Sequence, residues 1–178
     1  YISSFQAGSS CSSLKDYISC ADRAIELMQT KENLELIVED LFTQLLNDNV
    51  IYAEIRFAPL LHCEKGLDAK KVVEIICNAA STQSKKHNID YGLILCTLRH
   101  YSEDESLQTV KLVKQFIEKG VVGFDIAADE AGYPIDNHIT AFNYAKNNNL
   151  NITAHAGEAK GPESIWETVN ELHAKRIG

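Results

Sequence analysis

One short segment carries the clearest chemical signal in the sequence. In TAHAGE, residues 153–158, His155 ends an apolar, strand-like run and Glu158 follows three positions later, beyond a small Ala-Gly turn. A neutral imidazole at a strand end can ligate a metal ion, and the carboxylate can return over the same site. Hydrolysis assisted by a metal needs an ion that lowers the pKa of water and a carboxylate that moves the proton. The segment therefore indicates metal-assisted hydrolysis, although a lone histidine is more often a hydrogen-bonded structural residue.

Charged side chains also occupy strand-like runs where a structural barrel would place Val, Ile or Leu. In residues 50–59, Glu54 and Arg56 share one face, opposite an apolar face that helices must cover. Arg99 and Asp125 belong to two later runs of the same kind. A buried charge is costly unless it is paired or binds a metal. We therefore expect these four residues to form a charge-balanced set, two of each sign, beneath a pocket. The alternative is a solvated rim of strand ends with nothing bound.

The runs that carry these residues alternate with helical patterns. Strands are expected within residues 50–59, 90–100, 121–130 and 151–158. Helices are expected over residues 68–87, 102–119, 137–148 and from Pro162 onward. The second of these helices opens on a capping box, Ser102 with Glu105 three residues on. Units of strand and helix that recur every ~30 residues imply parallel strands, and polar strand ends favour a barrel whose site lies at the carboxyl ends.

Two helical stretches, Leu14–Met28 and Lys31–Asn47, precede the first strand. The second has aliphatic residues at helical spacing and should lead directly into that strand. The first is expected to cross the mouth of the barrel, with simple core packing as the alternative. The expected organisation is a single partial α/β barrel domain, with a helical lid segment over residues 1–29. Residues 30–178 then form strand–helix units that end in Arg-Ile-Gly at the start of another strand.

Composition argues against several other classes of protein. The 178 residues contain 17 Lys and Arg against 25 Asp and Glu, a net charge of −8, without a basic stripe for nucleic acid or an anionic membrane. No apolar run is long enough to span a membrane, and residues 1–13 do not resemble a signal peptide. Five widely spaced cysteines favour single thiols in a reducing cytoplasm. The absence of a glycine-rich phosphate loop removes the main support for a dinucleotide or P-loop fold.

Taken together, several segments resemble the adenosine deaminase family, in the family's order and at suitable spacing. They are YAEIRFAPLLH (52–62), GFDIAADEAGYP (123–134), TAHAGE (153–158) and the closing RIG (176–178). The helical SLKDYI (13–18) is similar to the family's segment over the pocket mouth, so the resemblance covers essentially the whole chain. It implies a (β/α)₈ TIM barrel that hydrolyses the 6-amino group of adenosine or 2′-deoxyadenosine. The products would be inosine or 2′-deoxyinosine and ammonia, and the enzyme would use one zinc ion.

The resemblance also implies roles for individual residues. His155 would be a zinc ligand, and Glu158 would protonate N1 of the purine while a zinc-activated water attacks C6. Ala128 stands where the family usually has the glycine whose backbone N–H meets the purine, and its methyl group bears on substrate preference rather than on the type of reaction. The lid over the ribose would be lined by Leu14, Tyr17 and Ile18. The charged set expected from the strand pattern, Glu54, Arg56, Arg99 and Asp125, would support the site from beneath.

Other parts of the family's site fall outside the sequence. Its His-x-His zinc pair would precede Tyr1, its catalytic histidine would follow Gly178, and its paired aspartates would come later still. The chain is therefore expected to supply roughly strands two to five of the barrel, and to hold no catalytic zinc and show no activity by itself. Two alternatives stay open. One is an adenine or N6-modified adenylate deaminase of the same superfamily, and the other is a non-catalytic paralogue that binds a nucleoside.

Overall fold

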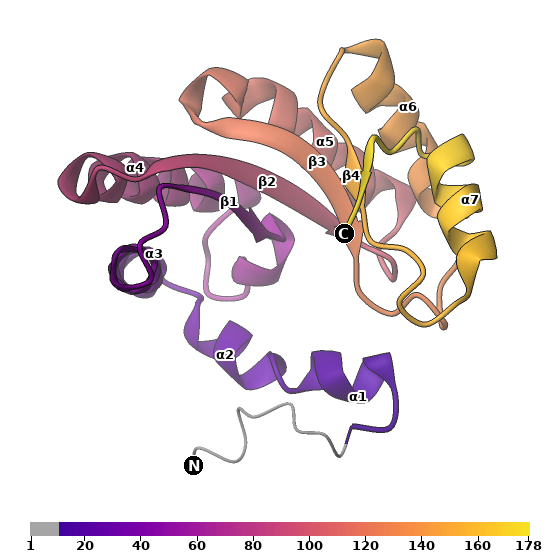
Figure 1. The fold of residues 1–178 in the computed structure, drawn as a ribbon, viewed down its shortest axis with the longest axis horizontal. Coiled ribbons are helices and arrows are strands. Elements are labelled where there is room, and N and C mark those ends of the chain that lie inside the picture. The colour runs from indigo at the N-terminus through magenta and orange to yellow at the C-terminus, as the bar shows by residue number, and fades with distance from the viewer. Residues whose placement is uncertain (1–10) are drawn as a thin grey trace.

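The computed structural model describes residues 11–178, which form parallel strands covered by helices (Figure 1). The strands are β1 (Tyr52–Phe57), β2 (Asp90–Leu98), β3 (Val121–Ala127), β4 (Thr153–Ala154) and β5 (Arg176–Ile177). β1, β2 and β3 pair in that order, and β4 pairs with β5. A parallel bridge between Phe124 and Ile152 connects β3 to the segment that leads into β4. The strands therefore follow one another in chain order, which confirms the sector of a parallel α/β barrel that the strand–helix repeat predicts.

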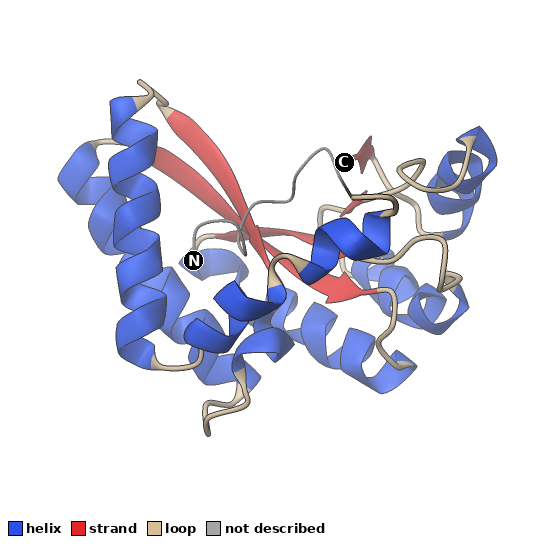
Figure 2. Cartoon of the chain, turned by 90° about the horizontal axis from the view of Figure 1, so that it is seen from below, coloured by secondary structure: helices blue, strands red, loops and turns tan. Residues whose placement is uncertain are grey.

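Helices cover the outer side of the sheet (Figure 2). α3 (Lys31–Asn47) leads into β1. Each strand is then linked to the next by one helix: α4 (Ala69–His87), α5 (Glu103–Phe116), α6 (Ile139–Asn147) and α7 (Pro162–Glu171). The predicted capping box at α5 is present, since Ser102 and Glu105 each accept a hydrogen bond from the other's backbone N–H. Within residues 11–178, no helix combines the length and the apolar character needed to cross a membrane.

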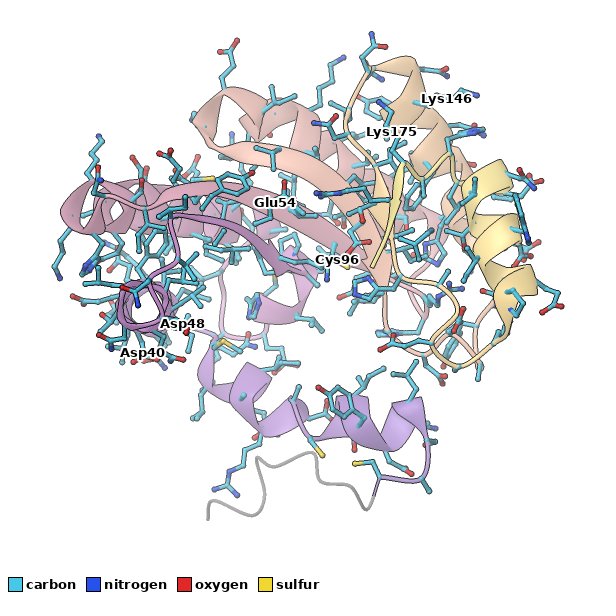
Figure 3. All side chains as sticks on the ribbon, in the orientation of Figure 1. Asp40, Asp48, Glu54, Cys96, Lys146 and Lys175 are labelled. Carbon is cyan, nitrogen blue, oxygen red and sulfur yellow. The ribbon has the colours of Figure 1, made fainter. Side chains whose placement is uncertain are left out.

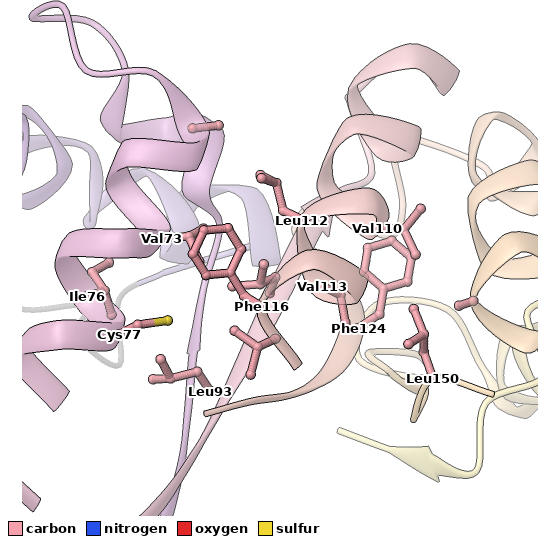
Figure 4. Close-up of a cluster of buried hydrophobic side chains, with 14 of the residues drawn as sticks. Val73, Ile76, Cys77, Leu93, Val110, Leu112, Val113, Phe116, Phe124 and Leu150 are labelled. Atoms are coloured by element: carbon pink, nitrogen blue, oxygen red, sulfur yellow. The ribbon is translucent and has the colours of Figure 1, made fainter. Parts of the chain in front are cut away.

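The outer face of the strands forms the hydrophobic core (Figure 4). Leu93 of β2 and Phe124 of β3 pack against α4 and α5, whose contributions include Val73, Val110 and Phe116, all at most 1% exposed. Because successive strand residues point to opposite sides, the residue after Phe124 must face the interior of the barrel. Strand residues that alternate with this apolar face therefore point into the barrel.

The segment before α3 differs from the single helix expected over Leu14–Met28. It forms two short helices, α1 (Leu14–Ser19) and α2 (Asp22–Leu27), and neither contains a buried residue. Without a packed face, nothing stabilises a continuous helix across the turn at residues 20–21. Gln29 anchors the segment, since its side-chain amide donates to the Leu61 carbonyl at 2.7 Å and accepts from the Glu64 N–H at 3.0 Å. α1 and α2 therefore run beneath the strand ends in Figure 1 while tied to the loop after β1.

Candidate active site

Three strands, β1, β3 and β4, bring one polar side chain each to the inner side of the sheet, where β2 lies between β1 and β3. Asp125 of β3 is completely buried and forms an ion pair with Arg56 of β1. The same carboxylate oxygen, Oδ2, lies 3.2 Å from Nδ1 of His155, which follows β4 directly. Two of the four residues expected as a charged set, Arg56 and Asp125, are thus in contact. They also contact the residue that the sequence singled out as a metal ligand.

The surroundings of His155 fix its tautomer. Nδ1 lies 3.1 Å from the carbonyl oxygen of Ile126, which can only accept a hydrogen bond, so Nδ1 carries the proton. Nε2 then keeps its lone pair, and Arg56 donates to it from Nη1 at 2.9 Å. Gly178 lies beside both groups: a Cβ on it would come within 3.3 Å of the imidazole Cε1 and 3.4 Å of the guanidinium Nη2. The imidazole therefore presents a neutral nitrogen suited to a metal or a proton.

The remaining members of the expected charged set pair elsewhere. Glu54 accepts from Arg176 at 2.5 Å and from the Tyr52 hydroxyl at 3.1 Å, on the inner side of β1. Figure 3 shows Glu54 near the middle of the molecule. Arg99 does not approach Asp125. It is buried beyond the end of β2, and its Nη2 lies 4.0 Å from Glu130.

The reason for the different position of Arg99 lies in β2. Both faces of this strand are buried, so its residue types do not show which face is the inner one. The hydroxyl of Thr97 lies 2.7 Å from that of Ser106 on α5, which places the Thr97 side of β2 outward. The expected inner set of four is therefore replaced by three separate pairs: Arg56–Asp125, Glu54–Arg176 and Arg99–Glu130.

Glu130 was not among the residues expected to support the site. It is 2% exposed, and its carboxylate accepts from the N–H groups of Gly157, Ala159 and Lys160 at 2.7, 2.6 and 3.0 Å. It also accepts from the hydroxyl of Ser164 at 2.5 Å. Burial by itself would raise the pKa of Glu130, but these hydrogen bonds lower it to about 2. A carboxylate that is ionised at neutral pH therefore holds the turn that bears Glu158.

Two clefts open between the lid segment and the ends of β3 and β4. Glu158 is exposed and lines a cleft of about 630 Å³ together with Leu14. Ala128 and Ile18 line a second cleft of about 540 Å³. Asp129 lines both, which makes the clefts neighbours. The structure thus places Leu14, Ile18, Ala128 and Glu158 around one region.

Two residues need separate description, Tyr17 for its position and Ala128 for its backbone conformation. Tyr17 is 57% exposed and lines neither cleft. Ala128 has a φ of 82°, the left-handed conformation that glycine adopts without strain. Its methyl group therefore sits on a backbone shaped for glycine, directly after β3.

The metal-ligand inventory is small. Among residues 11–178, no three His, Cys, Asp or Glu side chains lie close enough together to hold a metal ion. The chemistry of His155 nevertheless fits one ligand of such a site, because a carbonyl fixes its Nδ1–H and leaves Nε2 as the donor atom. A complete site needs three or more protein ligands.

Parallel strand–helix units with polar groups at the carboxyl ends of the strands define the class of (β/α)₈-barrel proteins. An amidohydrolase from Burkholderia ambifaria, solved with bound zinc, superposes with a TM-score of 0.86 at 21% identity, over 99% of this chain and 48% of that one. The N6-mAMP deaminase of Arabidopsis superposes with a TM-score of 0.84 at 25% identity, over 93% of this chain and 51% of that one.

The particular family follows from the sequence comparisons. The family model described as adenosine deaminase matches residues 1–178. The adenosine deaminase of Clostridium acetobutylicum is 39% identical over 176 residues, which cover 99% of this chain and 52% of that protein. The chain belongs to the adenosine deaminase family. It spans about half the length of the curated relatives it matches.

Proposed function

We propose that the protein containing this chain is a zinc-dependent deaminase acting on adenosine and 2′-deoxyadenosine. Water adds to C6 of the purine, the bond from C6 to the amino group breaks, and ammonia leaves, so the product is inosine or 2′-deoxyinosine. The observation that carries the proposal is the position of His155, whose Nε2 keeps its lone pair and here accepts from Arg56, three residues before Glu158 at the carboxyl ends of the strands. Membership of the family supports the same reaction.

The metal would be held in part by this chain. Zinc, when bound, supplies a water molecule of lowered pKa at neutral pH. His155 would be the ligand through Nε2, because Nδ1 is committed to the Ile126 carbonyl. Asp125 lies beside Nδ1 and balances the charge of Arg56. These neighbours would orient the imidazole and keep its metal-binding nitrogen directed to the interior.

The other residues of the site would act on the purine nucleoside. Glu158 would hold a proton at N1 of the base, which removes the negative charge that develops on the ring when C6 is attacked. Its exposed carboxylate borders a cleft large enough for a small ligand. The backbone N–H of Ala128 would bind the base, and Leu14 and Ile18 would cover the ribose from the lid side.

A substrate panel tests this function directly. The full-length protein carrying this chain is purified, loaded with zinc, and assayed for ammonia release from adenosine, 2′-deoxyadenosine, adenine, AMP and N6-methyl-AMP. We expect the two nucleosides to have the highest kcat/KM. A higher value for adenine or for the adenylates would replace the proposed substrate with a base or a nucleotide. Nucleoside binding without ammonia release from any compound would identify a non-catalytic binding protein.

A further inference from the structure

The turn between β4 and α7 is held by a buried carboxylate that touches neither cleft. The three amides bound by Glu130 belong to Gly157, on one side of Glu158, and to Ala159 and Lys160 on the other. The clefts lined by Glu158 and by Ala128 do not include Glu130 among their walls. The carboxylate therefore fixes the backbone on both sides of the exposed Glu158 and leaves its side chain free in the cleft.

The strand end that precedes this turn is held from the same side by Arg99. Its Nη2 donates to the carbonyl of His155 at 3.0 Å, and its Nη1 donates to the carbonyl of Tyr133 at 3.4 Å. Because Nη2 also lies 4.0 Å from Glu130, the two charges are adjacent. One guanidinium and one carboxylate thus contact the main chain before and after Glu158, at His155, Gly157, Ala159 and Lys160.

Arg99 is itself fixed by a buried relay of polar groups. Its carbonyl can only accept, so Nε2 of His138, 3.1 Å away, carries a proton and donates to it. Nδ1 of His138 then accepts from the Ser106 hydroxyl at 2.6 Å, and that oxygen accepts from the hydroxyl of Thr97 at 2.7 Å. The relay ties the end of β2 to α5 and to the loop before α6, and so fixes the main chain from which the Arg99 side chain extends.

We propose that Glu130 and Arg99 are positioning residues, which set the place of Glu158 and His155 by gripping the main chain around them; this rests on the proposed deaminase function. A buried ion pair often stabilises a protein no more than apolar packing of the same volume, so stability alone does not explain its presence here. Precise placement of Glu158 does explain it, because a shift of about 1 Å in a proton donor can lower the rate about 100-fold.

The variant Glu130→Gln tests the role of the carboxylate. An amide has one acceptor oxygen and a donor NH₂ group, so it cannot accept all four hydrogen bonds. In the full-length, zinc-loaded protein we expect kcat for adenosine to fall about 100-fold, with KM within about threefold and zinc content unchanged. The matched control is Glu163→Gln, an exposed carboxylate in the first turn of α7, which should leave kcat unchanged.

A double-mutant cycle separates positioning from a general structural role. If Glu130 acts through Glu158, then Glu130→Gln has little further effect on kcat in a Glu158→Gln background. A full 100-fold loss in both backgrounds would overturn the proposal, as would an unchanged kcat in the single variant. Arg99→Lys keeps the positive charge but loses the planar guanidinium that donates to two carbonyls. We expect it to lower kcat about tenfold.

A second variant and a measurement that needs no turnover also test the proposal. Should Glu130→Gln fail to fold, Ser164→Ala removes one hydrogen bond while keeping the carboxylate, and a kcat loss of about threefold to tenfold that disappears in the Glu158→Gln background supports the proposal. Amide hydrogen exchange at residues 157, 159 and 160 measures the hydrogen bonds to Glu130 directly and needs no turnover. If the wild type deaminates none of the compounds, the proposed function is wrong. Unprotected amides at these three residues in the wild type would instead refute the restraint of the turn by Glu130.

Discussion

Nδ1 of His155 lies 3.1 Å from the carbonyl oxygen of Ile126, one strand away. This contact decides the chemistry available at the strand end, because it assigns the ring proton to Nδ1 and leaves the lone pair on Nε2. The imidazole is thus oriented with Nε2 as its only possible metal-binding atom. The carboxylate of Asp125 at 3.2 Å and the guanidinium of Arg56 hold the ring from two other directions.

Removing the charge of Asp125 should weaken metal binding. Asp125→Asn loses the ion pair with Arg56 and the charge beside Nδ1 of His155. Substitutions of this kind next to a metal ligand typically reduce metal affinity about 10- to 100-fold. Competition with a zinc chelator on the full-length protein measures the change. The control Asp48→Asn, at the exposed end of α3, should not alter zinc affinity, and equal affinity in both variants would contradict the role given to Asp125.

A glycine substitution usually lowers the free energy of unfolding, but at Ala128 we expect it to raise this free energy, because the backbone there is left-handed. At a φ of 82°, glycine avoids a steric cost of about 1 kcal/mol that alanine bears, so Ala128→Gly should raise the free energy of unfolding by up to that amount. Ala145→Gly, a buried position within α6, is the control and should lower the free energy of unfolding by about 1 kcal/mol or more. Urea denaturation measures both, and destabilisation by Ala128→Gly would contradict the strained geometry.

Glu130 should make the protein sensitive to acid. Its pKa is about 2 in the folded state and ordinarily 4.5, so its contribution is complete above about pH 4.5 and disappears as the pH falls through 2. On this basis about 2 kcal/mol is lost between about pH 6 and pH 3. The difference in free energy of unfolding between the wild type and Glu130→Gln should narrow by that amount over the range. A difference independent of pH would show that the carboxylate is not preferentially ionised in the folded protein.

The sequence predicts most of the elements because their signals are local. Apolar runs and capping residues locate β1 to β3 and α4 to α7 within a few residues, and Ser102 with Glu105 marks the start of α5. The lid helices are less regular than expected because no packed face reinforces their helical pattern. Local pattern is therefore sufficient wherever tertiary packing agrees with it.

The pairing of charges could be predicted only in part. Alternation along β1 directs Arg56 inward, where it meets Asp125. The partners Glu54 and Arg176 are 122 residues apart, and no local pattern connects them. Glu130 carried one weak signal, an acidic residue just beyond a strand end, but its partners are backbone amides, which every sequence contains. The part of the site made by main-chain groups is thus invisible before the fold is known.

Zinc content and adenosine deamination, measured together on the full-length protein and on His155→Ala, test the central claim most directly. The variant keeps a small apolar residue at the strand end and removes only the imidazole. The account predicts one zinc per wild-type molecule with measurable ammonia release, and loss of both in His155→Ala. A variant that retains stoichiometric zinc and wild-type turnover would contradict the assignment of this imidazole to the metal and with it the proposed mechanism.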